Sequence, residues 1–142
     1  MSETFTIQQA SRLTGLSVPT LRYYERVGLI DAVPRDRTSG HRVYDDDTVQ
    51  TAEALACLRA TGMGIDDMRT YRSAMAEGRA AAPRQRELFE SHVSRVADEI
   101  ASLQVRLEYL QQKVALWGAR EHGDPDAEQR ATERLRALAA RL

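Results

Sequence analysis

The sequence predicts a mainly α-helical protein, in which a winged helix-turn-helix domain precedes a long helix that forms an antiparallel coiled-coil dimer. Two short helical patterns are joined through Gly15-Leu16-Ser17, which is typical of a helix-turn-helix. A basic stretch without helical periodicity follows at residues 34–44. Beyond Pro83, apolar residues recur at alternating spacings of four and three for about four heptads. We expect the domain over residues 1–79, the coiled-coil helix over 84–118 and a short helical tail over 119–142.

Capping residues mark both short helices. Residues 6–9 (TIQQ) have the spacing of a capping box, so the first helix should begin there and end at Gly15. Ser17 is the N-cap candidate of the second helix. Pro19 is tolerated in the first turn because the backbone N–H has no helical partner there. The second helix then runs as far as Gly28.

The basic stretch at residues 34–44 (PRDRTSGHRVY) predicts a hairpin wing. Ser39-Gly40 supplies the turn, and residues 41–44 can return as a strand. A third helix follows, with N-cap candidates at residues 45–47 and an end at Gly62. A fourth begins near residue 65 and frays by residue 78, and residues 80–83 are expected to be a hinge or loop.

The heptad seam is the strongest periodic signal in the chain. A helix cannot bury so long an apolar stripe alone, so we expect a homodimer. β-Branched residues in the seam favour a parallel pair, but an antiparallel pair centred near Leu103 brings Glu99 close to Arg106 of the partner subunit, and we favour that arrangement. The predicted dimerisation residues are Phe89, Val93, Val96, Ile100, Leu103, Leu107, Leu110, Val114 and Trp117.

Composition places limits on the function. The charges nearly cancel, with 20 basic and 21 acidic residues, but residues 1–44 hold six arginines against four acids. A basic first third is a modest indication of phosphate binding.

No apolar run approaches the ~20 residues of a membrane span, and the N-terminus lacks a signal-peptide apolar region. With Cys57 as the single cysteine, there is no intrachain disulfide, and we expect a cytoplasmic protein without a membrane partner.

Residues 20–30 (TLRYYERVGLI) resemble the recognition helix of MerR-family transcription regulators. Arg35 with residues 40–44 (GHRVY), residues 62–65 (GMGI) and the heptad helix follow in the family's order, so the resemblance covers residues 5–117. It implies a winged helix domain, an antiparallel coiled-coil dimer and binding to a palindrome between promoter elements set too far apart. Such regulators distort double-stranded promoter DNA so that RNA polymerase can engage both elements.

The candidate DNA-binding residues lie on the second helix and the wing. Arg22 can reach base edges or phosphates in the major groove, and tyrosine hydroxyls can contact phosphates. Wing arginines would clamp the flanking backbone, and the amides at the start of the second helix suit a phosphate. Taken singly, a tyrosine pair is usually packing and an arginine-rich loop usually a solvated surface. The candidates are Ser17, Thr20, Arg22, Tyr23, Tyr24, Arg35, Arg42 and Tyr44.

Cys57 has two interpretations. On a helical wheel it lies nearly opposite the apolar side of the third helix. A lone cysteine here resembles the NmlR/AdhR-type branch of the family, in which the thiol is associated with a response to aldehydes and other electrophiles. Its place in the C-terminal half of the helix and Glu53 one turn earlier both disfavour a thiolate. Free cysteines are also commonly inert packing residues.

Two other functions compete with a promoter regulator. An architectural, excisionase-like DNA-bending protein would share the helix-turn-helix and wing but would not need a long coiled coil. A coiled-coil interaction protein would merely retain the motif. We expect no enzyme and no cofactor, because no nucleophile–base pair or glycine-rich phosphate loop is visible. A soft-metal site is not expected either, because one cysteine and the scattered His41, His92 and His122 are too few ligands.

Overall fold

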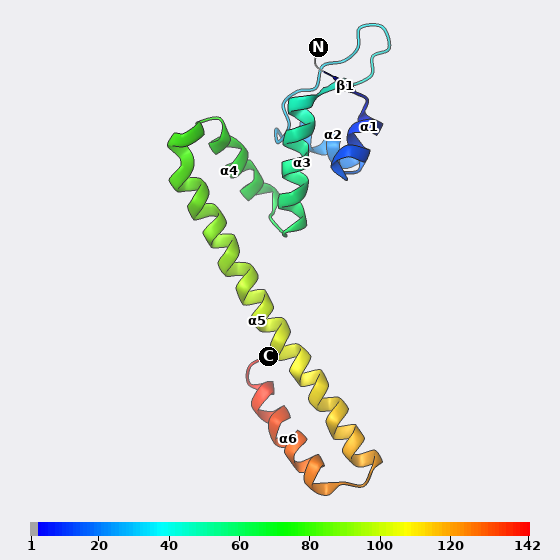
Figure 1. Cartoon of the computed structure of the whole chain (residues 1–142), viewed down its shortest axis with the longest axis vertical. Coiled ribbons are helices and arrows are strands. Elements are labelled where there is room, and N and C mark those ends of the chain that lie inside the picture. Colours follow the sequence, from blue (N-terminus) through cyan, green and yellow to red (C-terminus); the bar gives the residue numbers. More distant parts are fainter. Residues whose placement is uncertain (1–2) are drawn as a thin grey trace. The chain divides into compact units, whose positions relative to one another are not determined.

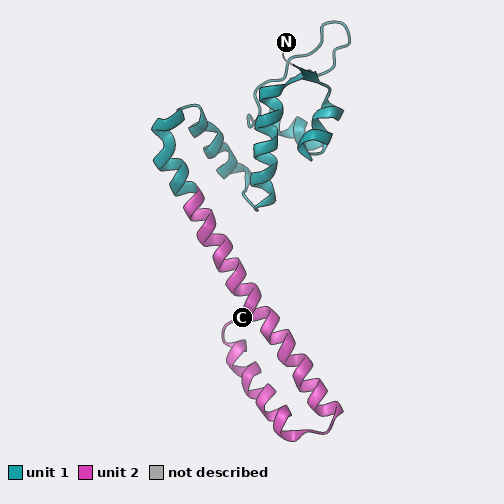
Figure 2. Ribbon diagram, viewed as in Figure 1, with its two compact units in different colours: residues 1–88 teal, residues 89–142 magenta. Residues whose placement is uncertain are grey.

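The computed structural model describes residues 3–142 and is mainly helical, which confirms the predicted class (Figure 1). The chain divides into two compact units, residues 1–88 and residues 89–142 (Figure 2). The elements are β1 (Thr4–Phe5), α1 (Ile7–Thr14), α2 (Val18–Arg26), β2 (Tyr44–Asp45), α3 (Asp46–Ala60), α4 (Ile65–Met75), the 3-10 helix η1 (Gly78–Ala81), α5 (Ala82–Glu121) and α6 (Pro125–Ala139).

The predicted caps of α1 and α2 are confirmed. Thr6 Oγ1 accepts a hydrogen bond from the Gln9 amide at 3.1 Å, and Gln9 Oε1 accepts one from the Thr6 amide at 2.8 Å. Gly15 ends α1 with a φ of 76°, a conformation that glycine adopts without steric cost. Ser17 Oγ then accepts the Thr20 amide at 3.2 Å and starts α2. The helix-turn-helix is therefore set by local chemistry.

The wing is a hairpin between α2 and α3, as predicted. Arg35 and Arg42 pair across it in an antiparallel bridge, and the Val43 amide donates to the Pro34 carbonyl at 2.8 Å. Its returning strand, β2, pairs with β1 in the register Phe5 to Tyr44. The sequence indicated the return but not this partner, because two residues are too short for a recognisable strand pattern.

The core of the first unit lies among α1, α2 and α3. Asp45 Oδ1 caps α3 by accepting the Thr48 amide at 2.8 Å, and α1 packs against both α2 and α3. The apolar side predicted for α3 is confirmed: Val49, Ala52 and Leu55 are buried. Leu58, the fourth residue of that side, is half-buried. The fully buried large side chains of this unit are Leu21, Tyr24, Leu29, Ile30, Tyr44, Leu55 and Met68.

The hinge or loop expected at residues 80–83 is wrong. The 3-10 helix covers Gly78–Ala81, and α5 begins at once with Ala82. Three alanines favour helix, and Pro83 stands in the first turn, where its missing N–H costs nothing. An ion pair between Arg84 and Glu77 further ties the start of α5 to the segment that follows α4.

The second unit is a hairpin of α5 and α6. The tail is helical as expected, and Asp124 Oδ1 caps α6 by accepting the Ala127 amide at 3.1 Å. Leu116 of α5 packs with Ala131 and Leu135 of α6, with Tyr109 beside them. The Arg134 guanidinium also forms two hydrogen bonds, of 2.7 and 2.8 Å, with the Glu108 carboxylate.

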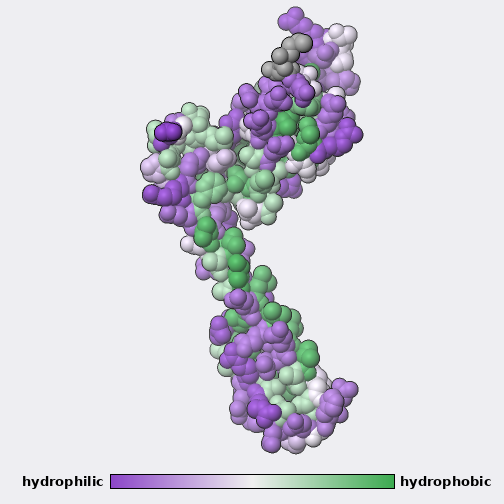
Figure 3. Space-filling view, in the orientation of Figure 1, coloured by the Kyte–Doolittle hydropathy of each residue, from purple (hydrophilic) through white to green (hydrophobic). Residues whose placement is uncertain are grey.

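A second apolar face of α5 stays exposed along the predicted seam (Figure 3). Phe89 and Val96 are half-buried. The other seven seam residues are between 51% and 74% exposed: Val93, Ile100, Leu103, Leu107, Leu110, Val114 and Trp117. Across residues 3–142, none of the helices combines the length and the apolar character that a membrane crossing requires.

Candidate nucleic-acid interface

The α2 helix turns one face to the core and another to solvent. Leu21 and Tyr24 are buried, and their spacing of three residues puts them on the same side. Arg22 and Arg26 are exposed, and Tyr23 is 38% exposed. The Arg26 guanidinium stacks 5.5 Å from the centroid of the Tyr23 ring. The exposed face therefore offers two cations and one accessible phenol.

The structure corrects two of the predicted contacts. Tyr24 is 2% exposed and Tyr44 0%, and both hydroxyls are buried without a hydrogen-bond partner among residues 3–142. Burial and the negative charge of Glu25 raise the pKa of Tyr44. Neither hydroxyl faces a position that a phosphate could occupy, so both tyrosines are core residues. The three-residue spacing from Leu21 to Tyr24 was the signal available in the sequence.

The N-terminus of α2 carries a polar cluster. The hydroxyls of Ser17 and Thr20 lie 2.8 Å apart. Arg59 Nη1, from near the end of α3, donates to Thr20 Oγ1 at 3.4 Å. The sequence does not indicate this contact, because it spans 39 residues and has no local pattern. The cluster adds an exposed cation at the positive end of the α2 dipole.

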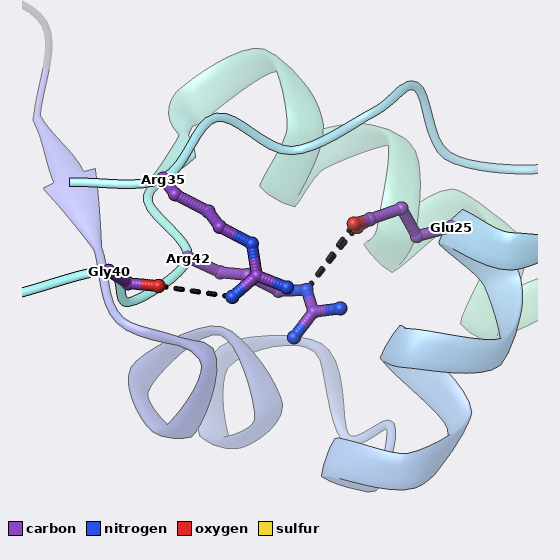
Figure 4. Close-up of polar contacts among 4 residues, drawn as sticks. All are labelled: Glu25, Arg35, Gly40 and Arg42. Carbon is purple, nitrogen blue, oxygen red and sulfur yellow. Dashed lines mark hydrogen bonds and ion pairs between the residues drawn. The ribbon is translucent and has the colours of Figure 1, made fainter. Parts of the chain in front are cut away.

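The two wing arginines have different surroundings (Figure 4). Arg35 is exposed, and its Nη1 donates to the Gly40 carbonyl at 3.0 Å across the hairpin. Arg42 is partly buried, and its Nε donates to both carboxylate oxygens of Glu25 in α2 at 3.3 Å. Arg42 thus fixes the wing to α2 and has part of its charge neutralised, whereas Arg35 retains its charge for a ligand.

The turn of the wing is organised by Asp36. Its Oδ1 accepts hydrogen bonds from the amides of Thr38 and Ser39, both at 2.8 Å. These two bonds hold the pKa of the Asp36 carboxyl below its ordinary value. Gly40 has a φ of 72°, which places a glycine where the chain reverses. The tip is therefore built from local contacts.

The wing, α2 and the start of α1 enclose an open cleft of about 620 Å³. Arg22, Arg35, Arg42 and His41 line it, with Asp36 as the acid in its wall. Because Arg42 is paired with Glu25, the charges of Arg22 and Arg35 are the ones that outweigh the Asp36 carboxylate, and together they favour an anion. The structure thus brings together all three of the arginines that were predicted to bind DNA.

Cys57 lies on the side of α3 away from the core, as the helical wheel predicts. Its side chain is exposed, and its thiol is free. Among residues 3–142, His, Cys, Asp and Glu side chains do not gather in groups of three that could hold a metal ion.

A helix-turn-helix, a basic hairpin wing and a long following helix define a protein of the winged helix-turn-helix class. The family model of MerR HTH family regulatory proteins matches residues 5–75. The chain belongs to this family.

Two curated relatives illustrate the range of similarity. An uncharacterized HTH-type transcriptional regulator of Haemophilus influenzae is 32% identical over 114 residues, which are 80% of this chain and 84% of that protein. The HTH-type transcriptional regulator AdhR of Bacillus subtilis is 42% identical over 72 residues, about half of each chain (51%). These relatives are transcription regulators and not enzymes.

Solved structures share the fold over most of the chain. HiNmlR, a MerR family regulator lacking the sensor domain, was crystallised bound to promoter DNA. It has a TM-score of 0.68 and 31% identity, covering 89% of this chain and 96% of its own. A MerR family regulator from Listeria monocytogenes has a TM-score of 0.69 and 25% identity, covering 96% and 98%.

Proposed function

We propose that this MerR-family regulator binds a palindromic promoter element as a homodimer and distorts it to control initiation by RNA polymerase. The observation that carries the proposal is the exposed Arg22–Tyr23 face of α2 beside a cleft lined by wing arginines. Its support is the similarity to HiNmlR, which was crystallised on promoter DNA and nearly all of which aligns with this chain.

The contacts follow from exposure and charge. The α2 helix enters the major groove with Arg22 toward base edges or phosphates, and Tyr23 donates its hydroxyl to a phosphate. Ser17, Thr20 and Arg59 receive a phosphate at the start of α2, and Arg35 contacts the flanking backbone. Arg42 chiefly orients the wing through Glu25. Bending a site costs on the order of 1–6 kcal/mol, which several phosphate contacts can offset.

The dimer is proposed to form through the exposed seam of α5. Large apolar patches on a protein surface usually mark an interface, and a heptad spacing fits a second copy of the same helix. Antiparallel packing centred near Leu103 brings Glu99 beside the partner subunit's Arg106. Both side chains are exposed in the chain alone, so the pair would contribute only ~0.2–1 kcal/mol to orientation.

The DNA-binding proposal is tested by Arg22→Ala. We expect it to weaken binding to the promoter fragment upstream of the chain's own gene at least about tenfold, because a charged hydrogen bond contributes roughly 1.5–3 kcal/mol. Fluorescence anisotropy over a salt series measures both affinity and the number of phosphate contacts. The control is Arg136→Ala, an exposed arginine on α6. Wild-type affinity in a folded Arg22→Ala variant would contradict the assignment.

Signal sensing is proposed for Cys57, because the thiol is exposed and the chain is similar to AdhR. In vitro transcription from the same promoter, with and without formaldehyde, compares the wild type with Cys57→Ala. We expect activation to require both aldehyde and thiol. Equal output from both proteins would remove the sensing role. DNA bending without any change in transcription would favour the architectural alternative.

A further inference from the structure

The C-terminal end of α2 is held by side chains from α4. Arg69 Nη2 donates to the Val27 carbonyl at 3.0 Å, and Arg72 Nε donates to the Leu29 carbonyl at 3.2 Å. Arg72 also pairs with Asp31 at 3.4 Å. Val27 is the C-cap of α2, where carbonyls have no partner within the helix, and Leu29 lies in the segment that follows. The α4 helix therefore holds both the end of α2 and the residues just after it. These contacts span 41 to 43 residues of sequence.

The α4 helix is also tied to the first turn of α5. Gln85 Nε2 donates to the Tyr71 carbonyl at 3.0 Å. Tyr71 stands in α4 between the two arginines that hold α2. A continuous series of polar contacts within the first unit therefore runs from α5 through α4 to α2.

The α4 helix has little apolar packing to hold it in place. Of its 11 residues only Met68 and Ala74 are buried. Open hollows of about 310 and 450 Å³ flank it, and both are lined by Arg69 and Ser73. Directional hydrogen bonds therefore have a larger part in fixing its position than they have for α3. We therefore expect that a shift of the residues bonded to α4 would shift α4 as well.

We propose that α4 couples the dimerisation helix to the recognition helix. Gln85 transmits a displacement of the first turns of α5 to α4, and Arg69 and Arg72 act as positioning residues that pass it to the C-terminal end of α2. The inference rests on the proposed function, in which α2 reads DNA and α5 continues into the dimer seam. It adds to that function the contacts through which the dimerisation helix α5 would set the orientation of α2 within the first unit.

The first test needs no DNA. Amide hydrogen exchange of the protein is measured by NMR for the wild type, Gln85→Ala and the control Arg79→Ala, an exposed arginine of η1. The amides to follow are those of Leu29 and Ile30, because both donate to the Tyr24 carbonyl of α2 and so report on the end of that helix. We expect several-fold faster exchange at these amides in Gln85→Ala, with α1 and α6 unchanged. Unchanged exchange, or a uniform rise throughout the first unit, would overturn the coupling.

The second test is a double-mutant cycle on operator affinity, with Gln85→Ala and Arg72→Ala singly and together. We expect each variant to weaken binding, and the pair to deviate from the product of the single effects by about threefold or more, as coupled sites do. Arg72→Lys, which keeps a positive charge and one donor nitrogen, should recover part of the affinity that Arg72→Ala loses. Gln85→Ala with Arg79→Ala should be multiplicative.

The outcomes separate the two proposals. Multiplicative effects for Gln85 and Arg72 would overturn the coupling even where the exchange result is positive. Should Arg72→Ala fail to fold, Arg69→Ala replaces it in the cycle, because its side chain is exposed and its contact equivalent. Absence of operator binding by the wild type would instead overturn the proposed function, and the exchange experiment would still decide whether α4 links α5 to α2.

Discussion

The two compact units bury their apolar residues to different extents. The first packs Leu21, Leu29 and Leu55 at 0% exposure. The second leaves Val93 and Val114 at 68% and 74% exposure. The first unit shows that this chain can bury its apolar side chains completely. The exposed apolar face of the second unit therefore supports the proposed dimer interface rather than loose folding.

The same contrast recurs within α5 itself. Leu116 is 7% exposed because α6 covers it, whereas Val114, only two residues away, is 74% exposed. One face of the helix thus has its partner in the same chain. The other has the heptad spacing suited to a second helix. The α6 helix covers one face of the C-terminal part of α5, and the seam on the other face stays exposed for the proposed second copy.

The substitution Leu103→Glu should have the largest effect, because it changes the exposed face of α5 and leaves the covered face intact. Near the centre of an antiparallel pair, the substitution removes two buried leucines, each contributing about 1.5–3 kcal/mol, and brings two carboxylates together. We expect the dimer to weaken more than about a hundredfold, since 1.4 kcal/mol corresponds to about tenfold. Sedimentation velocity measures the dimer, and Gln104→Glu is the matched control. An intact dimer in the Leu103 variant would refute the proposed seam.

A core truncation in the first unit sharpens the same contrast. Leu55→Ala leaves a cavity at a position with 0% exposure, which should lower the free energy of unfolding of the first unit by about 2–5 kcal/mol. The dimer should survive, because the seam lies in the second unit. Thermal melting with light scattering measures both, and Gln50→Ala on the exposed side of α3 is the control. Loss of the dimer in step with the first unit would show that the units do not fold independently.

How far the sequence predicts the structure depends on the range of the interaction. Caps such as Thr6, Ser17 and Asp45 act within three residues, and all three were predictable. The exposure of Cys57 followed from helical periodicity. Tyr24 was wrongly assigned to DNA, because the family motif outweighed its spacing from Leu21.

Contacts between distant segments lay beyond sequence reasoning. Arg42 meets Glu25 across 17 residues, and Arg59 meets Thr20 across 39. In each case a basic residue in the sequence indicates charge, but only the fold decides whether that charge is neutralised or exposed. The predicted hinge at residues 80–83 failed for a different reason. Alanine and an N-terminal proline are compatible with helix as well as with loop.

The smallest expected effect concerns the tip of the wing. Its hydrogen bonds lower the pKa of Asp36 in the folded state below the ordinary value of 3.8. The stabilisation of the turn by the Asp36 carboxylate is therefore fully present above that value, and it is lost as the pH falls through the lower folded-state pKa. Because the carboxylate is fully exposed, we expect no measurable change in the melting of either unit. The response should be confined to the amides of Thr38 and Ser39, which should exchange faster than the intrinsic acid dependence alone predicts. Amide exchange by NMR below pH 4 measures this, and Asp36→Asn should abolish the additional pH dependence at these two amides while leaving that of the Asp45 cap unchanged. A response that persists in Asp36→Asn would assign the turn's acid sensitivity to another group.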